Sequence, residues 1–371
     1  MKFSCLKSEL VQALQIAGRA SAVKPQTPIL SGIYLNADEG SLKVQATDYE
    51  ISVIISVNAE IESPGDIVVS SRYLQEVARS LPEEKVSFEY DAASKICKIS
   101  SGKSTFTLLS MSSDEFPKIR RVKGKQCFNI KDTALRELIR KTIFSCASDE
   151  SSPVFTGALF EIEENVVRMV ATNTHRLSLD EDTIDEPQKG KHSYIVPKRI
   201  LDELQHIMTS EIPSDVQVNC TDSEMSFELG NIYFTTRLIE GRFPDYHKVI
   251  PSSFPTRITL KTEEFLAAVS RVALIARSSD YNTIKLAFSM GQVHISSNNP
   301  IIGQAEEIVP AVIDGEDITI AFNSKYITDV LKNLRGDEFY FSVIAPLKPA
   351  AVREMGNEEF IYIVVPIRTK G

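Results

Sequence analysis

One pattern of apolar residues occurs three times along this chain of 371 residues. The steps between copies are 125 and 130 residues, so the spacing holds from end to end. The recurring positions are Phe3, Leu10 and Leu14, then Phe128, Leu135 and Ile139, then Ile258, Phe265 and Val269. Repetition at a near-constant period indicates a chain built from copies of one structural unit. The sequence therefore predicts three similar domains.

A second pattern repeats with nearly the same period, at steps of 127 and 126 residues. The three copies read Val69-x-x-Arg72-x-Leu74-x-x-Val77, Val196-x-x-Arg199-x-Leu201-x-x-Leu204 and Phe322-x-x-Lys325-x-Ile327-x-x-Val330. Between the copies, residues 121–126 and 251–256 lose the periodic pattern and contain Gly, Ser, Pro and charged residues, as linkers do. We therefore expect domains at residues 1–122, 126–250 and 256–371.

Apolar residues at helical spacing predict six amphipathic helices, two in each domain. Their expected ranges are 7–21, 72–80, 132–147, 197–208, 262–277 and 324–334. Alternating segments such as 29–36, 41–47 and 51–57 predict strands, roughly two dozen in all. The acidic segment 180–190 is expected to be a loop. The predicted fold class is α+β with antiparallel sheets, each domain being a duplicated β-α-β-β-β unit.

The composition is that of an ordinary globular protein, with 43 % apolar residues and no apolar run long enough to span a membrane. The N-terminal residues turn polar too early for a signal peptide. Five cysteines without a C-x-x-C pair indicate reduced thiols in a cytoplasmic compartment. The histidines show no metal-ligand spacing, and we expect neither a metal nor another cofactor.

Charge is distributed unevenly between the expected helices and the rest of the chain. The helices and their immediate flanks hold 17 Lys and Arg but only 9 Asp and Glu, although the whole chain has a net charge of −9. One solvent-facing stripe is basic or titratable in every copy, at Arg72 and Arg79, Arg199 and His206, and Lys325 and Lys332. Basic residues also favour solvent-exposed helix positions, and this preference alone would explain a basic stripe on any single helix. The recurrence favours a concave positive surface that holds a polyanion by its phosphates, without reading bases.

Short motifs along the chain resemble those of a known family. They are Thr27-Pro28-Ile29-Leu30, Ala46-Thr47-Asp48, Ala171-Thr172-Asn173-Thr174-His175-Arg176-Leu177, Gly241-Arg242-Phe243-Pro244-Asp245-Tyr246, Ser297-Asn298-Asn299-Pro300 and Tyr362-Ile363-Val364-Val365-Pro366-Ile367-Arg368. In this order, at these distances and on a threefold repeat, they make the whole chain similar to the bacterial DNA polymerase III beta subunit, the processivity sliding clamp. The resemblance implies a head-to-tail homodimer of crescents, closed into a ring whose helices line a channel for duplex DNA.

The resemblance also implies a function without catalysis, in which the ring tethers the replicative polymerase for processive synthesis. The implied partners are double-stranded DNA of any sequence, the polymerase III alpha subunit, the clamp loader, and clamp-binding-motif proteins of translesion synthesis, mismatch repair and ligation. The residues implied to contact DNA are Lys24, Arg72, Arg79, Arg136, Arg140, Lys198, Arg199, Lys325 and Lys332. Lys24 stands where the family commonly has arginine, so the charge stays but the bidentate fork is lost.

The subunit contact implied by the resemblance joins the first domain of one subunit to the third domain of the other. Its residues are Lys103, Phe106, Leu274, Ile275, Glu306 and Glu307, with Lys103 and the two glutamates as charge partners. Leu274 falls on the otherwise polar side of its expected helix. A subunit contact would explain an exposed leucine there, and burial under a local loop is the alternative.

The family's second site is an apolar groove between the second and third domains, where partner proteins insert a short peptide. The positions carried over are Phe155, Thr172, His175, Arg176, Leu177, Pro244, Lys248, Val249, Tyr326, Val364, Val365, Pro366, Ile367 and Arg368. Apolar anchors of an extended peptide bury themselves in such a groove, while polar rim groups set its register. Half of the side chains of 364–367 are also expected in a last core strand. Thr174 departs from the glycine common in the family, and Lys248 from arginine.

Two other functions remain open from the sequence. A repeat-built enzyme or small-ligand binder is disfavoured, because the only candidate motifs are incomplete. Ser101-Gly102-Lys103-Ser104 ends like a phosphate loop but has Cys97 at the first glycine position. His175-Arg176 has no nucleophile or carboxylate at motif spacing. A clamp paralogue with a repair or resistance role would keep the same ring.

Overall fold

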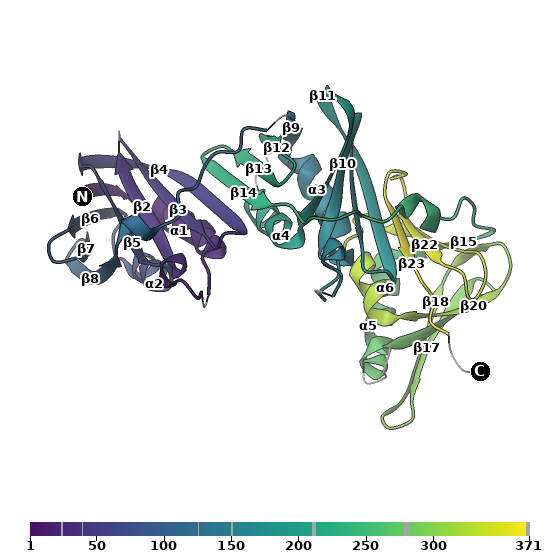
Figure 1. The fold of residues 1–371 in the computed structure, drawn as a ribbon. Coiled ribbons are helices and arrows are strands. Elements are labelled where there is room, and N and C mark those ends of the chain that lie inside the picture. The colour runs from purple at the N-terminus through teal and green to yellow at the C-terminus, as the bar shows by residue number, and fades with distance from the viewer. Residues whose placement is uncertain are drawn as a thin grey trace. The chain divides into compact units, whose positions relative to one another are not determined.

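The structure of the chain is a computed structural model that describes residues 1–23, 25–38, 40–124, 126–149, 151–209, 213–277 and 282–368. Lys24, which the sequence singles out for DNA contact, lies outside these residues. The chain divides into two units, and Figure 1 labels most of their helices and strands. The first unit is formed by Met1–Asp132 and His206–Leu238, and the second by Thr133–Gln205 and Ile239–Gly371.

In its described residues, the first unit contains one antiparallel sheet of 12 strands. The first eight along the chain are β1 (Lys2–Leu6), β2 (Gly32–Asp38), β3 (Ser41–Thr47), β4 (Ile51–Ser63), β5 (Gly65–Ser70), β6 (Lys85–Asp91), β7 (Ile96–Ser101) and β8 (Ser104–Met111). They pair in the order β1-β6-β7-β8-β5-β2-β3-β4, and β1 also pairs with β4, which closes the pairings into a ring. Helices α1 (Lys7–Ala20) and α2 (Ser71–Ser80) pack against each other and against these strands.

The same sheet continues beyond β4 through strands from the middle of the chain. They are β14 (Ile232–Arg237), β13 (Glu224–Leu229), β12 (Asp215–Cys220) and β9 (Gln126–Lys131), in that spatial order. The junction is a ladder in which Ile232 lies opposite Ile55 and Thr236 lies opposite Ile51. Backbone hydrogen bonds therefore run without a break from the expected first domain into the expected second.

In its described residues, the second unit contains two antiparallel sheets. The larger has the order β10 (Gly157–Thr172), β11 (Arg176–Pro197), β23 (Ile361–Val364), β22 (Ala350–Glu354), β21 (Glu338–Val343), β15 (Thr256–Lys261) and β19 (Val312–Asp314). The smaller has the order β18 (Gly303–Pro310), β17 (Gln292–Asn299), β16 (Thr283–Ser289) and β20 (Ile318–Asn323). Helix α5 (Thr262–Ala276) packs on α6 (Ser324–Leu331) and on the smaller sheet. Since β11 pairs with β23, the expected second and third domains share a sheet.

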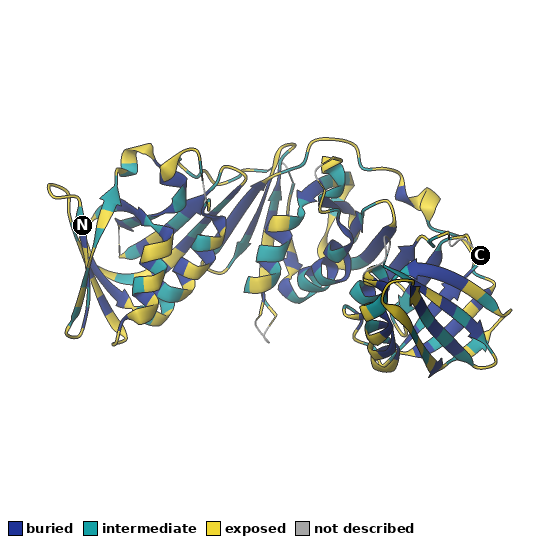
Figure 2. Ribbon diagram, turned by 90° about the horizontal axis from the view of Figure 1, so that it is seen from below, coloured by how far each residue is buried: buried dark blue, intermediate teal, exposed yellow. Residues whose placement is uncertain are grey.

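The repeat identified in the sequence marks the buried core. Each of its nine positions, from Phe3 to Val269, is at most 1 % exposed. All six expected helices are present in the described residues, including α3 (Asp132–Thr142) and α4 (Lys198–Ile207). α3 ends before the expected 132–147 because the chain tightens into a 3-10 turn at Ile143–Ser145. Figure 2 shows the physical basis of the repeat, with buried and exposed residues alternating along strands and segregating to opposite faces of helices.

One expected strand begins later than predicted, and one expected loop is wrong. Residues 29–31 belong to the 3-10 turn Pro28–Ser31 and not to a strand, and Pro28, with its fixed φ, suits the start of such a turn. The acidic segment 180–190 is part of β11 and not a loop. Asp180 lies opposite Met169 on β10, and the ladder resumes at Gln188 after an irregular stretch. Most side chains of residues 180–190 are exposed to solvent, so this part of β11 has the polar composition of a loop.

Candidate functional site

An apolar groove of about 640 Å³ opens on the second unit. It is lined by the turn between β10 and β11, the segment 243–251, the loop between β21 and β22, and the end of β23. The lining residues are Phe155, Thr172, Thr174, Arg176, Leu177, Phe243, Pro244, Asp245, Tyr246, Lys248, Val249, Pro251, Ile344, Lys348, Pro349, Ile363 and Val365. Val249 and Val365 are 52 % and 40 % exposed. A groove of this size and character can receive several apolar side chains of a ligand.

Strand alternation builds the floor of this groove. On β11, Leu177 and Leu179 project to the same face, because side chains two apart on a strand share a face. On the neighbouring β23, Ile361 and Ile363 join them in one buried apolar cluster, to which Tyr246 also belongs. Both strands have partners on each side, so the floor is held by backbone ladders as well as by packing.

Arg176 is a buried cation in the wall of the groove, only 6 % exposed. Its Nη1 atom lies 2.6 Å from Oδ2 of Asp329 on α6, and its Nη2 atom donates to the Phe144 carbonyl. Its Cζ atom also lies 4.6 Å from the centre of the Tyr326 ring. A buried charge is stable when it is paired and hydrogen-bonded in this way. Arg176 therefore fixes the start of β11 against α6.

The turn between β10 and β11 forms one rim of the groove. The hydroxyl of Thr172 donates to the Arg176 carbonyl over 2.7 Å and accepts from the Thr174 N–H over 3.1 Å. The Asn173 side chain accepts from the N–H groups of His175 and Arg176, each over 3.1 Å. Thr174 adopts φ of 74°, in the left-handed region where a β-branched residue is strained. This strain gives a physical reason for the glycine that the resemblance leads us to expect there.

Replacing Thr174 by glycine is expected to raise the free energy of unfolding by about 0.5–1 kcal/mol, because relief of left-handed strain exceeds the entropic cost of glycine. Urea denaturation of the full chain measures this difference. Thr319→Gly on β20 is a matched control without positive φ, and it should lose about 1 kcal/mol. An equal loss in both variants would show that Thr174 is not strained.

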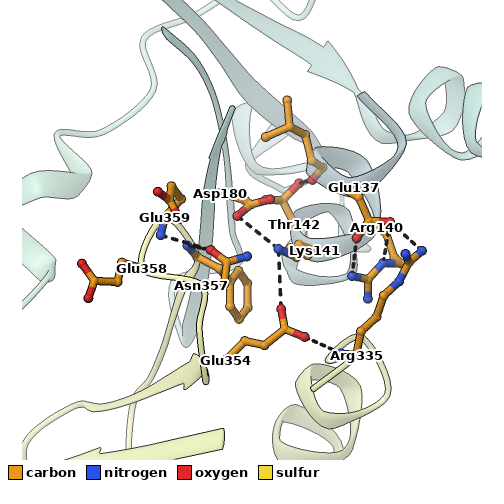
Figure 3. Close-up of polar contacts among 12 residues, drawn as sticks. Glu137, Arg140, Lys141, Thr142, Asp180, Arg335, Glu354, Asn357, Glu358 and Glu359 are labelled. Carbon is orange, nitrogen blue, oxygen red and sulfur yellow. Dashed lines mark hydrogen bonds and ion pairs between the residues drawn. The ribbon is translucent and has the colours of Figure 1, made fainter. Parts of the chain in front are cut away.

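A buried cluster of three charges is formed by side chains from α3, β11 and β22 (Figure 3). The Lys141 Nζ atom lies 3.6 Å from Oδ1 of Asp180 and 3.6 Å from Oε2 of Glu354. None of the three residues is more than 8 % exposed. The other carboxylate oxygen of Glu354 accepts the backbone N–H groups of Arg335 and Gly336. One buried cation is thus shared by two carboxylates.

Because Asp180 shares the Lys141 ammonium with Glu354, the attraction of this cation does not fully offset the cost of burying a charged Asp180 carboxylate. Burial raises the pKa of Asp180 to about 7, and the attraction of Lys141 offsets only part of that rise. Its Oδ1 atom has no hydrogen-bond partner among the described residues. We infer that this carboxyl exchanges its proton near neutral pH.

The structure brings eight of the fourteen predicted groove positions into the lining. They are Phe155, Thr172, Arg176, Leu177, Pro244, Lys248, Val249 and Val365. The other six lie outside it, namely His175, Tyr326, Val364, Pro366, Ile367 and Arg368. Val364 is fully buried in the C-terminal core because it alternates with Ile363 on β23. After Val365 the chain runs along β20, where the Ile367 N–H donates to the Ala321 carbonyl over 2.8 Å.

Nine lining residues were missed by the sequence reasoning. Phe243, Asp245 and Tyr246 belong to a motif that was noticed, so the signal for them was available. Thr174 and Ile363 also stand in motifs that carry the resemblance, and Pro251 begins the expected linker 251–256. Ile344, Lys348 and Pro349 lie in a loop that no motif marks. Their proximity depends on the β23 ladder and could not be found locally.

The basic residues predicted to contact DNA differ in how far their side chains are exposed. Arg72, Arg79, Arg199, Lys325 and Lys332 are exposed, whereas Arg136, Arg140 and Lys198 are partly buried. The Arg140 side chain is 13 % exposed, lies 2.6 Å from Glu137 and donates to the Asn333 carbonyl. Arg140 is therefore held by the fold. Arg72 is exposed, and the partners recorded for it among the described residues lie on its own helix, Glu76 at 3.1 Å and the ring of Tyr73 at 5.7 Å.

Among the strands of the described residues, β8 and β18 each have an open edge. β8 pairs with β7 along its length but with β5 only at Ser110 and Met111, and β18 pairs with β17 alone. Exposed apolar residues lie on or beside these strands. Leu109 is 78 % exposed, Ile308 60 % and Leu274 60 %. The described structure therefore excludes the alternative that Leu274 is buried under a loop.

The other residues predicted for a subunit contact are also at least partly accessible. Lys103 and Glu306 are exposed, and Phe106, Ile275 and Glu307 are half-buried. Glu307 already has a partner within the chain, since its Oε1 atom lies 2.6 Å from Nε of Arg271. This pair weakens the expectation that Glu307 is a charge partner of Lys103.

Models of one family match the chain in order. They describe the N-terminal domain of the DNA polymerase III beta subunit at residues 1–120, the central domain at 129–245 and the C-terminal domain at 247–368. The chain belongs to the DNA polymerase III beta subunit family. The resemblance found in the sequence is thereby confirmed, as are the α+β class and the three clamp domains.

Individual relatives match over the full length. The chain is 32 % identical to the beta sliding clamp of Bacillus subtilis (strain 168), with 100 % of both chains covered. It is 29 % identical to that of Staphylococcus aureus (strain Mu50 / ATCC 700699), again with 100 % of both covered. The crystal structure of the DNA polymerase sliding clamp from Bacillus subtilis superposes with a TM-score of 0.94 at 31 % identity, covering 100 % of both chains. A sliding clamp from Pseudomonas aeruginosa bound to griselimycin gives 0.94 at 28 % identity and the same coverage.

No described helix is both long and apolar enough to cross a membrane. No group of three or more His, Cys, Asp or Glu in the described ranges is placed to hold a metal ion.

Proposed function

We propose that this chain is a sliding clamp, a ring-shaped homodimer that encircles duplex DNA and tethers the replicative polymerase for processive synthesis. The observation that carries the proposal is the ordered match of three clamp-domain models along the chain. The proposed domains are residues 1–122, 126–250 and 256–371, in a crescent that forms half of the ring. The ring acts by its topology, so the proposal includes no catalytic residue and no cofactor, and it places the protein in the cytoplasm.

Exposed cations on the helices support a DNA channel. Arg72 and Arg79 lie one above the other on α2, seven residues apart, and Lys325 begins the matching stripe of α6. Their long side chains can reach phosphates from the solvent. Phosphate contacts carry no sequence information and are individually weak in water. A channel lined in this way would hold DNA of any sequence and still slide.

The open edges of β8 and β18 support a head-to-tail subunit contact. An open edge leaves backbone N–H and C=O groups available, and pairing with another chain satisfies them. Apolar residues near the two edges, Phe106 and Leu109 on one and Leu274 and Ile308 on the other, would be buried in the same contact. A heterologous contact of this kind makes a closed ring when two copies complete the circle.

The groove supports a second role as a docking site for short peptides of partner proteins. Its floor is apolar and preformed, and exposed Val249 and Val365 leave apolar surface for anchors. Extended peptides bind such grooves through a few buried side chains. The proposed partners are the polymerase alpha subunit, the clamp loader and the clamp-binding-motif proteins of translesion synthesis, mismatch repair and ligation.

Reversing Arg72 and Arg79 to glutamate is expected to shorten the lifetime of the protein on nicked circular DNA by about tenfold at low salt, because two phosphate attractions become repulsions. The experiment loads the full chain with a clamp loader and measures retention by gel filtration. Cutting the circle should release the wild type at once, since only topology holds it. The doubly substituted control Lys43→Glu, Lys98→Glu has the same net charge but changes exposed strand residues. Unchanged retention in the arginine variant would refute the DNA-contact assignment, and slow release from linear DNA would refute encirclement.

A further inference from the structure

A second cavity, of about 390 Å³, adjoins the groove and shares residues 243–246 with it. We call it the polar pocket, because hydrophilic side chains dominate its lining. They are Glu161, Lys191, Ser193, Arg242, Asp245 and His247. The segment 243–246 is thus a wall common to an apolar groove and a polar pocket. A ligand that fills the groove and extends past this wall would reach the polar pocket.

The buried base of the polar pocket is a carboxylate whose interactions are already complete. Glu161 is 6 % exposed and accepts the hydroxyl of Tyr246 over 2.6 Å and that of Ser193 over 3.2 Å. The Nζ atom of Lys191 lies 3.4 Å from it, and Nη1 of Arg168 lies 3.7 Å away. Burial opposes its ionisation, but these partners outweigh burial and hold the pKa of Glu161 below its usual range. Glu161 therefore offers little to a further cation.

The mouth of the polar pocket has the opposite character. Asp245, the second carboxylate of the lining, is neutralised by Lys248, whose Nζ atom lies 3.2 Å from it. Arg242 and His247 are exposed, and neither side chain has an ion pair with a described residue. The guanidinium of Arg242 thus presents donors that no acceptor in the described chain takes up. A carboxylate is the ligand group that fits a guanidinium in a fixed fork geometry.

Tyr246 joins the two cavities physically. Its ring belongs to the apolar cluster under the groove, and its hydroxyl donates to Glu161 in the polar pocket. Its ring centre also lies 4.2 Å from that of His247. Because one buried residue anchors the shared wall from both sides, the distance between the apolar floor and the polar mouth is fixed. A peptide whose apolar and polar side chains have the same separation could contact the groove floor and the mouth of the polar pocket at once. Its affinity would then increase without a rearrangement of residues 243–246.

We propose that the polar pocket binds an acidic side chain that flanks the apolar anchors of a docked peptide, with Arg242 as its principal contact. This inference rests on the proposed peptide-docking role of the groove and specifies the chemistry of the peptide that fits best. The acidic residue selects among partner peptides, because a neutral residue at that position leaves Arg242 solvated and gains nothing.

The test compares synthetic peptides that share two apolar anchors and differ only in the flanking residues. One series has Asp and Glu on either side of the anchors, and the other has Asn and Gln. Fluorescence anisotropy measures the affinity of each for the full-length wild type, for Arg242→Gln, and for the matched control Arg120→Gln, an exposed arginine of the first unit. The acidic flank is expected to tighten binding to the wild type by about three- to tenfold, as partly exposed charge pairs do.

The outcomes test the assignment of the polar pocket separately from the docking role of the groove. The expected result is that Arg242→Gln removes the advantage of the acidic peptide, leaves the neutral peptide unchanged, and that Arg120→Gln changes neither. Loss of the advantage at high salt would agree with a charged contact. An equal advantage in wild type and Arg242→Gln, or none in the wild type, would overturn the assignment of the polar pocket. Failure of the neutral peptide to bind the wild type would instead overturn the docking role of the groove.

Discussion

Replacing Lys141 by methionine is expected to lower the free energy of unfolding by about 3–5 kcal/mol near pH 8, because the change leaves two buried carboxylates without their cation. Asp180 and Glu354 each lie 3.6 Å from the Lys141 ammonium. Methionine fills a similar volume, so the loss of packing is small and the electrostatic effect dominates. The loss is large because these residues are at most 8 % exposed and water cannot replace the ammonium.

The effect of Lys141→Met should depend on pH, and the pKa of Asp180 sets the direction. In the unfolded chain an aspartate ionises near pH 4, whereas the folded pKa of Asp180 is about 7. Between these values the folded protein binds more protons than the unfolded chain, so the contribution of Asp180 to stability falls as pH rises and then levels off. Without Lys141 the folded pKa of Asp180 rises further and the fall extends above pH 7. The variant should therefore differ least from the wild type near pH 5.

Urea denaturation of wild type and variant at about pH 5 and about pH 8 measures both effects. Lys285→Met, an exposed position on β16, is the matched control and should change stability by no more than about 0.5 kcal/mol. Asp180→Asn should remove much of the pH dependence between pH 4 and 7 while the protein remains folded. A loss in Lys141→Met that is the same at both pH values would contradict the shared-cation account of the cluster.

The core of this fold could be predicted from the sequence because its determinants are local and repeated. Phe3, Leu10 and Leu14 lie on one strand and one helix, and their spacing alone indicates a common buried face. The same face recurs in the other copies, so each position is supported three times. The acidic part of β11 could not be predicted in this way. Its polar side chains lie on a largely solvated ribbon, and only the ladder with β10 reveals a strand.

The groove could be predicted only in part, because two of its walls depend on long-range pairing. Leu177 and Pro244 lie in motifs that the sequence displays, and both line the groove. The β21–β22 loop lies at the groove with Leu177 and Pro244 because β23 pairs with both β11 and β22. The sequence shows no local signal for this pairing. Lys141 illustrates the same limit. It follows Arg140 in a basic stretch, and nothing in the helix indicates that carboxylates from β11 and β22 enclose it.

Introducing a charge at the groove without disturbing the fold is expected to give the largest effect on partner binding. Val249→Asp should weaken a peptide with apolar anchors by about 30- to 100-fold, or about 2–3 kcal/mol, because the anchor would have to desolvate a carboxylate. Val249 is 52 % exposed, so the substitution should leave the free energy of unfolding within about 0.5 kcal/mol of the wild type. Fluorescence anisotropy with the neutral peptide measures the affinity, and urea denaturation checks the fold.

The Val249 variant also separates the two roles proposed for the protein. Val312→Asp, on β19 and outside the groove, is a matched control at a position that is 71 % exposed. A ring held by topology should keep Val249→Asp on circular DNA once it has been placed there, because the groove does not hold the DNA. Polymerase stimulation should nevertheless fall in step with peptide affinity, since tethering depends on the groove. If stimulation persisted in Val249→Asp while peptide binding was lost, the polymerase would have to bind elsewhere on the ring, and the groove would not be its docking site.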